Sequence, residues 1–348
     1  MNRNNKKVIV AMSGGVDSSV TAFMLQNSGY EVIGVFMRLG VDQGFAEDSA
    51  RRVCQKLSIK FYPFNVAPNF RKEVVDYFLK SYAKGLTPNP CIQCNKFIKF
   101  GELLKLADQL GAEYLATGHY VIKQETQNIE QKYKLFKGKD ETKDQSYFLY
   151  NLTQKQLERI LFPLGNYKKE EVKKIAKKNN LPVQESESQD ICFLSGGHND
   201  FLKDKISLKP GKIVALNGEE LGKHQGLPLY TIGQRRGVEI GGTGPYYVVK
   251  IDYKKNILYV SKDRDDPALY AKKIKLSKTN WISGEKPEFP FQCQAVIRYR
   301  HQPAACEVYQ EKNSKLSVDF SQPQRAIAPG QSVVFYKGKE VLGGGVII

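Results

Sequence analysis

The first 120 residues alternate between short β-type apolar runs and longer amphipathic runs. The β-type runs are KKVIVAM (6–12), EVIGVFM (31–37), IKFYPFNV (59–66) and EYLATGHY (113–120). The amphipathic runs, with helical spacing of apolar residues, are VTAFMLQNSG (20–29), AEDSARRVCQKL (46–57), 69–84 and about 97–110. This alternation predicts an open parallel α/β sheet that binds ligands at the carboxyl ends of its strands. Cys54 falls on the apolar face of its helix and is expected in the core.

The segment after residue 120 carries two further patterns. Residues 121–138 read as a hairpin inserted after the fourth strand. In KKEEVKKIAKK (168–178), Val172, Ile175 and Ala176 line one helical face and lysines fill the rest. Those lysines form either a solvated face or an RNA contact.

Beyond about residue 201, helical periodicity nearly disappears. Glycine and proline separate short β-rich runs such as YYVVKIDY, ILYVSKD and QSVVFYKG. We expect two small β domains, the second barrel-like. The expected division is 1–200 for the α/β domain, 201–276 for the central β domain and 277–348 for the C-terminal β-barrel domain.

Composition and charge narrow the class of protein. The chain has 348 residues, six cysteines and a net charge of +17. Six cysteines are too few for a disulfide scaffold and indicate a reducing cytoplasm. No apolar run is long enough to cross a membrane, and the N-terminus reads as a strand, not as a signal peptide. The positive charge fits either a nucleic-acid partner or a lysine-rich surface.

The loop SGGVDSS (Ser13–Ser19) lies between a predicted strand and a predicted helix. Gly14 and Gly15 allow a sharp turn, serines add hydroxyl donors, and the helix N-terminus favours an anion. The loop is not a Walker A sequence, because no Gly-Lys-Ser/Thr follows. It predicts a phosphate cradle; the alternative is a glycine turn with a capping serine.

Several motifs together resemble one family. SGGVDSS resembles the pyrophosphatase loop (PP-loop) of enzymes that adenylate a substrate. TPNPCIQCNKFIKFGELL (87–104), ATGHY (116–120), KDQSYFLY (143–150), SQDICF (188–193), the segment 210–237 and GGGVI (343–347) are similar to the bacterial tRNA-uridine 2-sulfurtransferase family (MnmA/TrmU). The resemblance runs from Val8 to the C-terminus.

The resemblance implies a fold and a reaction. The fold is an N-terminal open parallel-sheet ATP-pyrophosphatase domain, like the adenine nucleotide alpha hydrolases, followed by two small β-rich domains. The reaction is ATP-dependent 2-thiolation of the wobble uridine of tRNAs for Lys, Glu and Gln, with Mg²⁺. The uracil O2 is adenylated, pyrophosphate leaves, and a cysteine persulfide supplies the sulfur. A cysteine desulfurase or a persulfide relay protein would be the sulfur donor.

The same resemblance implies site residues. For ATP these are Ala11, Met12, Ser13, Gly14, Gly15, Val16, Asp17, Ser18, Met37 and Gly118. For the target base and tRNA they are Asn89, Pro90, Cys91, His119, Lys143, Asp144, Gln145, Arg298, Tyr299 and Gln331. The catalytic pair is Cys94, the nucleophile, and Cys192, the persulfide intermediate.

Thiol chemistry gives this pair a physical basis. Turning a carbonyl into a thiocarbonyl requires a sulfur nucleophile and a second thiol that helps to release the sulfur. Cys94 precedes a helix expected to begin near Phe97, and the helix dipole and Lys96 would favour its thiolate. Cys192 follows the polar segment ESESQD. Glu185 and Glu187 are unexpected there, because basic residues are common in the family.

Cys91 departs from the residue that many family members carry, an aspartate. It is a spectator, an auxiliary redox thiol, or an iron–sulfur ligand together with Cys94 and Cys192. A structural zinc site is disfavoured, because no second cysteine or histidine pair completes four ligands. Cys293 and Cys306 are expected to be structural.

Three implied site residues keep alternatives, whereas Gly118 has a single expected role. Met37 packs either the adenine or the core. Gly118 is expected against the nucleotide, where a side chain would not fit. His119 is either a tRNA contact or structural. Asp17 orders either Mg²⁺ or the loop.

Two other functions compete with thiolation. A small-molecule ligase could use the same loop, but its substrate domain would replace the basic β domains and the cysteines would be idle. A non-catalytic RNA-binding module would leave the loop as a relic, which the intact Ser13, Gly14, Gly15, Asp17 and Ser18 oppose.

Overall fold

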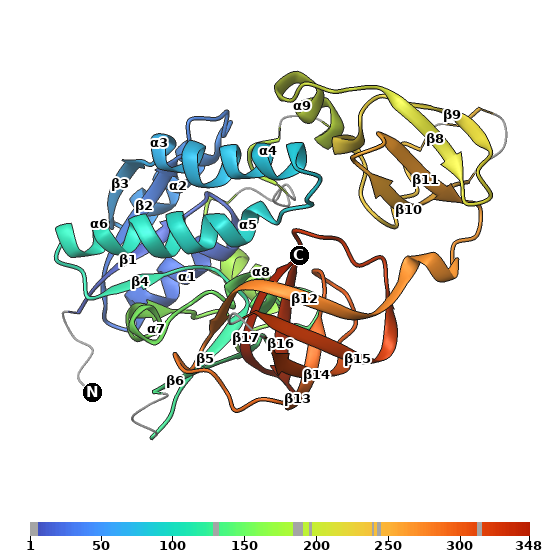
Figure 1. Cartoon of the computed structure of the whole chain (residues 1–348). Helices are drawn as coiled ribbons and strands as arrows, with labels where there is room; N and C mark the ends of the chain where they lie inside the picture. The colour runs from blue at the N-terminus through green and yellow to red at the C-terminus, as the bar shows by residue number, and fades with distance from the viewer. Residues whose placement is uncertain are drawn as a thin grey trace.

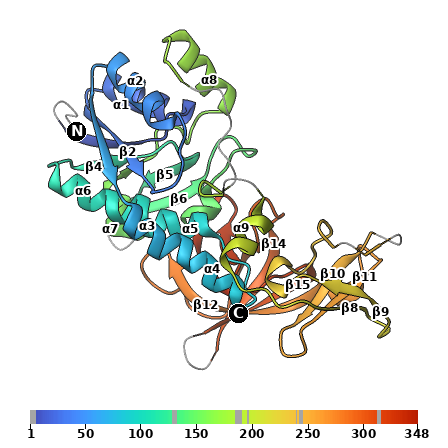
Figure 2. The same ribbon diagram turned by 90° about the horizontal axis from the view of Figure 1, so that it is seen from above.

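The computed structural model describes residues 6–127, 132–183, 191–194, 197–238, 240–241, 245–311 and 315–348. Three parts follow one another along the chain: an α/β part, a small β sheet and a β barrel (Figure 1). In both views the small sheet lies at the end of the molecule away from the N-terminal sheet (Figures 1 and 2). Within the described ranges, no helix is both long and apolar enough to span a bilayer.

The N-terminal sheet has five parallel strands in the order β3-β2-β1-β4-β7. Their bounds are β1 Lys7–Met12, β2 Glu31–Arg38, β3 Lys60–Asn65, β4 Tyr114–Ala116 and β7 Ile160–Leu161. The central strand β1 is almost fully buried, as expected for a sheet covered on both faces. Because the strands are parallel, the segments that follow β1, β2 and β4 meet at one edge of the sheet.

Helices cover the two faces of this sheet. Val8 and Val10 of β1 pack on one face with α1, α2 and α8, whereas Ile9 packs on the other with α6. These helices span Val16–Asn27 (α1), Ala46–Lys56 (α2), Leu103–Gln109 (α6) and Lys169–Lys178 (α8). The period-two alternation of β1 therefore separates two cores, as in other doubly wound sheets.

Two long helices each contain a π-helical stretch. The first runs through α3 (Ala67–Phe70), η1 (Arg71–Val75) and α4 (Asp76–Ala83). The second runs through α5 (Pro90–Gln93), η2 (Cys94–Glu102) and α6. π-Helical turns are rare in proteins, and those that occur are often found at functional sites. The remaining helices before the small sheet are η3 Ser146–Leu149, α7 Gln154–Arg159 and α9 His198–Lys205.

The small sheet has four strands in the order β10-β11-β8-β9, of which β8 and β11 are parallel. The strands span Gly211–Ala215 (β8), Glu220–His224 (β9), Tyr247–Asp252 (β10) and Ile257–Ser261 (β11). Two short 3₁₀ helices, η4 Leu227–Leu229 and η5 Pro267–Leu269, belong to the connections.

The C-terminal barrel closes through six antiparallel strands. The order β12-β15-β14-β13-β16-β17 returns to β12 through the β12–β17 pairing. Its strands span Tyr270–Trp281 (β12), Phe291–Val296 (β13), Ala304–Gln310 (β14), Leu316–Arg325 (β15), Ser332–Lys337 (β16) and Glu340–Ile347 (β17).

A hairpin of the N-terminal part extends the barrel's sheet. Strands β5 (Val121–Glu125) and β6 (Tyr133–Lys137) pair with each other, and β6 pairs with β17 at Phe136–Glu340 and Leu135–Val341. The N-terminal part and the barrel thus share a hydrogen-bonded sheet, which couples them more firmly than side-chain contacts alone.

The predicted fold class is confirmed, and one local prediction is wrong. The cysteine helix begins at Pro90 instead of near Phe97, because Asn89 caps it and Pro90 occupies its first position. The short strand β7 was not predicted. The expected boundary at residues 276/277 lies within strand β12. The division into 1–200, 201–276 and 277–348 stays a prediction.

Candidate functional site

The loop after β1 forms a cradle at the carboxyl edge of the sheet. Ala11 and Met12 end the strand, and Val16, Asp17 and Ser18 form the first turn of α1. The Ser18 hydroxyl bonds back to the Ser13 backbone N–H (3.1 Å) and lies 3.2 Å from the Ser13 hydroxyl. The first-turn N–H groups of a helix have no intrahelical partner, so they are free to bind an anion.

The two loop glycines have different tasks. Gly14 has φ +76°, and a Cβ there would lie 2.5 Å from the Ala46 carbonyl oxygen. Ser49 on α2 also donates a hydrogen bond to the Gly14 carbonyl. Gly15 has φ −87° and space for a Cβ. Of the pair, Gly14 needs the left-handed conformation, and it serves the packing of the loop on α2.

Gly118 and Met37 lie at the same edge of the sheet. Gly118 follows β4, and a Cβ there would lie 2.9 Å from the Asp17 carbonyl carbon and 3.1 Å from the Ser18 nitrogen. Its missing side chain is therefore required by the loop itself. Met37 is the penultimate residue of β2; it is half-buried and packs against two separate cores. Adenine contact by Met37 stays a prediction.

Asn89 begins the helix that carries the cysteines. Its side-chain oxygen accepts hydrogen bonds from the backbone N–H groups of Cys91 (3.1 Å) and Ile92 (3.3 Å). Pro90 follows at the first helical position, where its missing N–H costs nothing. Cys94 then opens the π-helical stretch, buried, in the same core as Leu39 and Phe193.

Three cysteine thiols from two distant segments lie within electrostatic range of one another. Cys91 and Cys192 both act on Cys94, and Cys91 also acts on Cys192. Lys99 is the cation that acts on Cys94 and on Cys192. In a π-helix, residues five apart lie on one side, so the π-helical stretch brings Lys99 onto the side of Cys94. The predicted catalytic pair is thus brought together.

The structure does not favour the thiolate that the sequence predicts at Cys94. Burial raises the pKa of the Cys94 thiol to about 12, and Lys99 only partly opposes the effect. Lys96, which the sequence suggested, is exposed and stacks over Phe97. The protein around Cys192 likewise raises the pKa of its thiol, although the residue as a whole is exposed. Both thiols are therefore neutral near pH 7 in this arrangement.

The described part of the chain, which includes Cys91, Cys94 and Cys192, contains no group of three His, Cys, Asp or Glu side chains that could hold a metal ion. The three thiols therefore form no metal-ion site in this arrangement, no reaction step is assigned to a cluster, and an iron–sulfur role of Cys91 stays a prediction. Cys91 is half-buried in the first turn of the helix. Glu185 and Glu187 lie outside the described residues.

His119 connects the ATP loop with the cysteine helix. It follows Gly118, which packs on Asp17, and its ring lies 5.8 Å from that of Phe100 on η2. The ring nitrogen Nδ1 is 2.7 Å from the Thr117 hydroxyl. Burial holds the pKa of His119 well below its ordinary value. The His119 side chain is only 7 % exposed, which fits a structural role. Its contact with tRNA stays a prediction.

The segment before the cysteine helix contacts both β parts of the molecule. The Thr87 N–H donates to the Pro329 carbonyl (2.8 Å), and the Gln331 side chain donates to the Thr87 carbonyl (2.9 Å). The Thr87 hydroxyl lies 3.0 Å from the Thr231 hydroxyl of the central part. Gln331, predicted as a tRNA contact, therefore holds the segment that leads to Asn89.

The other predicted tRNA residues lie at the seam between the N-terminal part and the barrel. Tyr299 packs on Phe148, with ring centroids 4.4 Å apart, whereas Arg298 is exposed. The Asp144 carboxylate accepts from Ser146 and Gly138, and the Gln145 side chain accepts from the Tyr120 N–H. Lys143 precedes them, half-buried. Asp144 and Gln145 thus have internal partners, and Arg298 keeps a side chain open to solvent.

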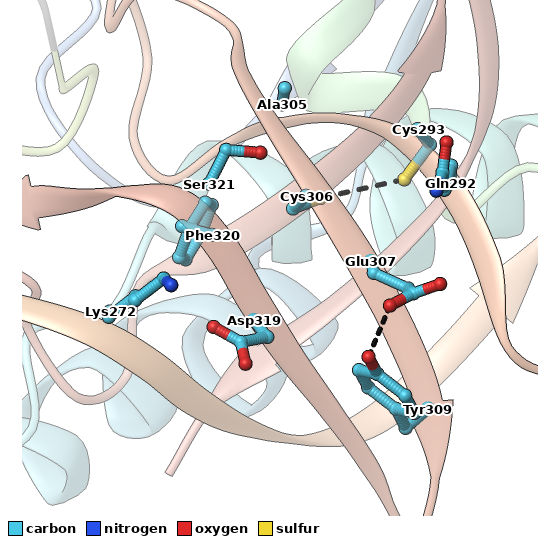
Figure 3. Close-up of a pocket in the computed structure, with 10 residues that line it drawn as sticks. All are labelled: Lys272, Gln292, Cys293, Ala305, Cys306, Glu307, Tyr309, Asp319, Phe320 and Ser321. Atoms are coloured by element: carbon cyan, nitrogen blue, oxygen red, sulfur yellow. Dashed lines mark hydrogen bonds between the residues drawn. The ribbon is translucent and has the colours of Figure 1, made fainter.

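Cys293 and Cys306 lie apart from this site, in the barrel. They face each other across β13 and β14 with their sulfurs 3.6 Å apart (Figure 3). A hollow of about 370 Å³ adjoins the pair and is edged by polar residues such as Lys272, Glu307 and Asp319. No residue predicted for ATP or tRNA lines it. Cys54 is fully buried, as predicted.

Two lysines of this region were missed by the sequence reasoning. Lys99 was passed over for Lys96 because the π-helical stretch was not foreseen. Lys169 was counted among the lysines of a solvated or RNA-contacting helix face, whereas it forms an ion pair with Asp17 of the loop. No spacing in the sequence signals either contact.

Family models match the chain in three consecutive segments. A "tRNA methyl transferase HUP domain" matches residues 6–196, a "tRNA methyl transferase PRC-barrel domain" residues 199–262, and an "Aminomethyltransferase beta-barrel domain" residues 271–347. The first match alone covers more than half of the chain. The three segments follow the order of the α/β part, the small sheet and the barrel.

Curated relatives match over nearly their whole length. A protein of Caldanaerobacter subterraneus subsp. tengcongensis named "tRNA-specific 2-thiouridylase MnmA 1" is 46% identical, covering 99% of this chain and 98% of the relative. Proteins named "tRNA-specific 2-thiouridylase MnmA" from Carboxydothermus hydrogenoformans and Shouchella clausii are 46% and 42% identical. They cover 98% and 99% of this chain, and 97% of each relative is covered.

Proposed function

The chain belongs to the tRNA-specific 2-thiouridylase MnmA family, and we propose that it 2-thiolates the wobble uridine of tRNAs of the Lys, Glu and Gln type. The reaction class is ATP-dependent thiolation of a tRNA uridine. The finer assignment is supported by one observation above all. Cys94 and Cys192, from distant segments, lie within electrostatic range beside the strand edge that carries the ATP loop.

The first step activates the uracil. The uracil O2 attacks the α-phosphate of ATP, so that an O–P bond forms and pyrophosphate leaves. The loop from Ser13 to Ser18 would hold the phosphates with its N–H and hydroxyl groups, while Met37 and Gly118 border the nucleotide. The tRNA base must leave its stack to reach this site, which an unpaired anticodon nucleotide can do at low cost.

The second step transfers sulfur. The terminal sulfur of a Cys192 persulfide attacks C2 of the adenylated base, and AMP leaves with the former O2. The Cys94 thiolate attacks the inner sulfur of Cys192, so that the persulfide S–S bond breaks and a Cys94–Cys192 disulfide forms. A reductant of the thiol class then regenerates both thiols. Because both thiols are neutral in this structure, binding of substrate must expose or deprotonate Cys94 before this step.

Magnesium would enter this site together with the ATP phosphates. The only carboxylate of the loop Ser13–Ser19 is Asp17, and its oxygens already accept from Lys169 and Tyr120. A magnesium site built on Asp17 therefore does not fit this arrangement. Mg²⁺ commonly keeps several waters and binds substrate phosphates, so no protein ligand is assigned to it. The sulfur donor would be a cysteine desulfurase or a persulfide relay protein.

The test is mass spectrometry of nucleosides after an unmodified anticodon stem-loop is incubated with the protein, ATP, Mg²⁺ and a persulfide source. We expect 2-thiouridine from the wild type and none from Cys94→Ser or Cys192→Ser, because a serine can neither carry persulfide sulfur nor close the disulfide. Both variants should still bind ATP. Cys293→Ser, a cysteine outside the site, is the matched control and should remain active.

Two outcomes would contradict parts of this proposal. Full activity of either serine variant would remove that thiol from the reaction. Cys91→Asp, which restores the residue common in the family, should stay active if Cys91 is a spectator. If iron co-purifies anaerobically near one cluster per chain and Cys91→Asp loses both iron and activity, the spectator role is wrong.

A further inference from the structure

Asp17 of the ATP loop is held by partners from two other segments. The Lys169 ammonium lies 2.6 and 2.7 Å from the two carboxylate oxygens of Asp17. The Tyr120 hydroxyl donates to the first of these oxygens at 2.7 Å. A carboxylate in the first turn of α1 is thus bound to a cation at the start of α8, a helix far along the chain.

The position of Lys169 is fixed by packing. Val172 and Ala176 of α8 are buried in the same core as Val20 of α1, so the two helices are held side by side. The Lys169 N–H also donates to the Asp140 carboxylate at 2.8 Å. The backbone of Lys169 is therefore held by the core between α8 and α1 and by the hydrogen bond to Asp140. From this position the Lys169 side chain extends to the loop.

A lysine at the first position of a helix stands at the positive end of the helix dipole, which is unfavourable without an anion nearby. Asp17 supplies that anion in this structure. The Lys169 side chain is 21 % exposed and the Asp17 side chain 34 %, so the pair lies at the surface of the cradle, within reach of a ligand. Lys173 on the same helix is exposed and, among the described residues, has no ion pair of this kind.

The charge balance of the loop changes when a nucleotide binds. A triphosphate seated on the first-turn N–H groups of α1 would bring several negative charges next to the Asp17 carboxylate. Asp17 alone would repel them, and Lys169 is the cation within the described residues that contacts it. An ammonium that both neutralises Asp17 and donates to phosphate oxygens resolves the conflict.

We propose that Lys169 is a substrate-binding residue, whose ammonium contacts the phosphate groups of ATP, and that Asp17 is the positioning residue that holds it at the loop. This inference rests on the proposed use of ATP. It assigns Asp17 a task that needs no protein-bound Mg²⁺. Lys169 belongs to the nucleotide site and not to a solvated helix face.

The experiment measures nucleotide binding by the full-length protein without tRNA. Calorimetry gives the ATP affinity, and saturation-transfer NMR follows adenosine. We expect Lys169→Met to weaken ATP binding by about tenfold or more, the size of a lost charge-assisted hydrogen bond, and to leave adenosine binding unchanged. Lys169→Arg should retain most of the affinity, and Lys173→Met all of it.

A double variant separates direct contact from mere neutralisation of Asp17. If Lys169 only cancels the Asp17 charge, Asp17→Asn combined with Lys169→Met restores ATP affinity, and the inference is wrong. If Lys169 touches phosphate, the double variant stays weak. Equal losses for ATP and adenosine would show collapse of the loop and would also overturn the inference, as would wild-type affinity of Lys169→Met.

A different experimental result would overturn the proposed function itself. A wild-type protein that binds no ATP would overturn the ATP-dependent reaction, and the role of Lys169 with it. A wild type that binds ATP and thiolates RNA while Lys169→Met binds ATP normally would reject the role of Lys169 alone.

Discussion

At the scale of single residues, the most consequential property of the site is the neutral state of Cys94. A thiol needs to ionise before it can attack a persulfide, yet burial places the pKa of Cys94 at about 12. The thiolate would then be about one part in ten thousand at pH 8. Such a thiol is protected from adventitious oxidation in this arrangement.

Lys99 is expected to decide how easily that thiol ionises. Its positive charge lowers the pKa of Cys94, so Lys99→Met should raise the pKa further and slow alkylation of Cys94 by iodoacetamide at pH 8 by at least about threefold. The rate should rise tenfold per pH unit below the pKa in both proteins. The measurement is peptide mass spectrometry of Cys94 labelling over time.

Lys96→Met is the matched control for this prediction. It removes the same charge from the same helix, but Lys96 is exposed and has no interaction with the thiols among the described residues. Equal slowing by both substitutions would show that the general charge of the helix acts on Cys94, and would remove the special position of Lys99.

At the scale of elements, the cysteine helix depends on its first turn. Asn89 is its cap, so Asn89→Ala should cost about 1 kcal/mol locally and speed hydrogen exchange of the Cys91 and Ile92 amides. Thiolation should fall because Cys94 follows within the first two turns. Hydrogen–deuterium exchange with mass spectrometry measures the first effect directly.

Asn89→Asp tests whether the cap is the whole role of this residue. Aspartate caps a helix as well as asparagine does, so exchange should stay at the wild-type rate. Retained thiolation would then assign Asn89 to capping. Lost thiolation with normal exchange would assign its amide to the target base, in agreement with the family resemblance.

The comparison between sequence and structure is most instructive in this helix. Hydrophobic periodicity from Phe97 onward predicted a helix, and a helix is there. Its start at Pro90 was missed because the expected start was taken from the apolar spacing, whereas Asn89 as cap and Pro90 at the first position set the actual start. The π-helical stretch has no signature in hydrophobic spacing, since Cys94 and Ile98 are buried in one core at a spacing that an ordinary α-helix would also give.

At the scale of the whole molecule, the predicted parallel sheet and β-rich remainder are confirmed, whereas the contacts between them could not be read from sequence. The motifs around Thr87 and Gln331 were both recognised, but nothing in either shows that they touch. The same holds for Asp17 and Lys169. Long-range polar contacts depend on the final arrangement of elements, and local patterns do not encode it.

The contact of the barrel with the Thr87 segment can be tested at Gly330. This glycine has φ +92°, and a Cβ would lie 2.8 Å from the Thr87 nitrogen. Gly330→Ala should push the segment away and misplace the cysteine helix, lowering the thiolation rate on the order of tenfold to a hundredfold. ATP affinity should stay within about twofold, since the loop Ser13–Ser18 lies elsewhere on the sheet edge.

Gly338→Ala controls for backbone strain in the Gly330 experiment. Gly338 also has a positive φ, +61°, but no atom lies within 4 Å of its added Cβ. Thiolation rate and thermal midpoint are measured for both variants. If the two alanines lower thiolation equally, strain in the barrel explains the loss, and the contact with Thr87 does not.

The pairing of β6 with β17 has a consequence for the α/β part when it is produced without the barrel. The N-terminal part contains both the ATP loop and the three thiols of the candidate site. A protein truncated after this part would therefore keep all of these residues. Without the barrel, however, β6 would present bare backbone groups that invite other chains to pair. A gene fragment encoding the α/β part alone would therefore yield a self-associating product. In the full-length protein, pairing with β17 covers part of that edge.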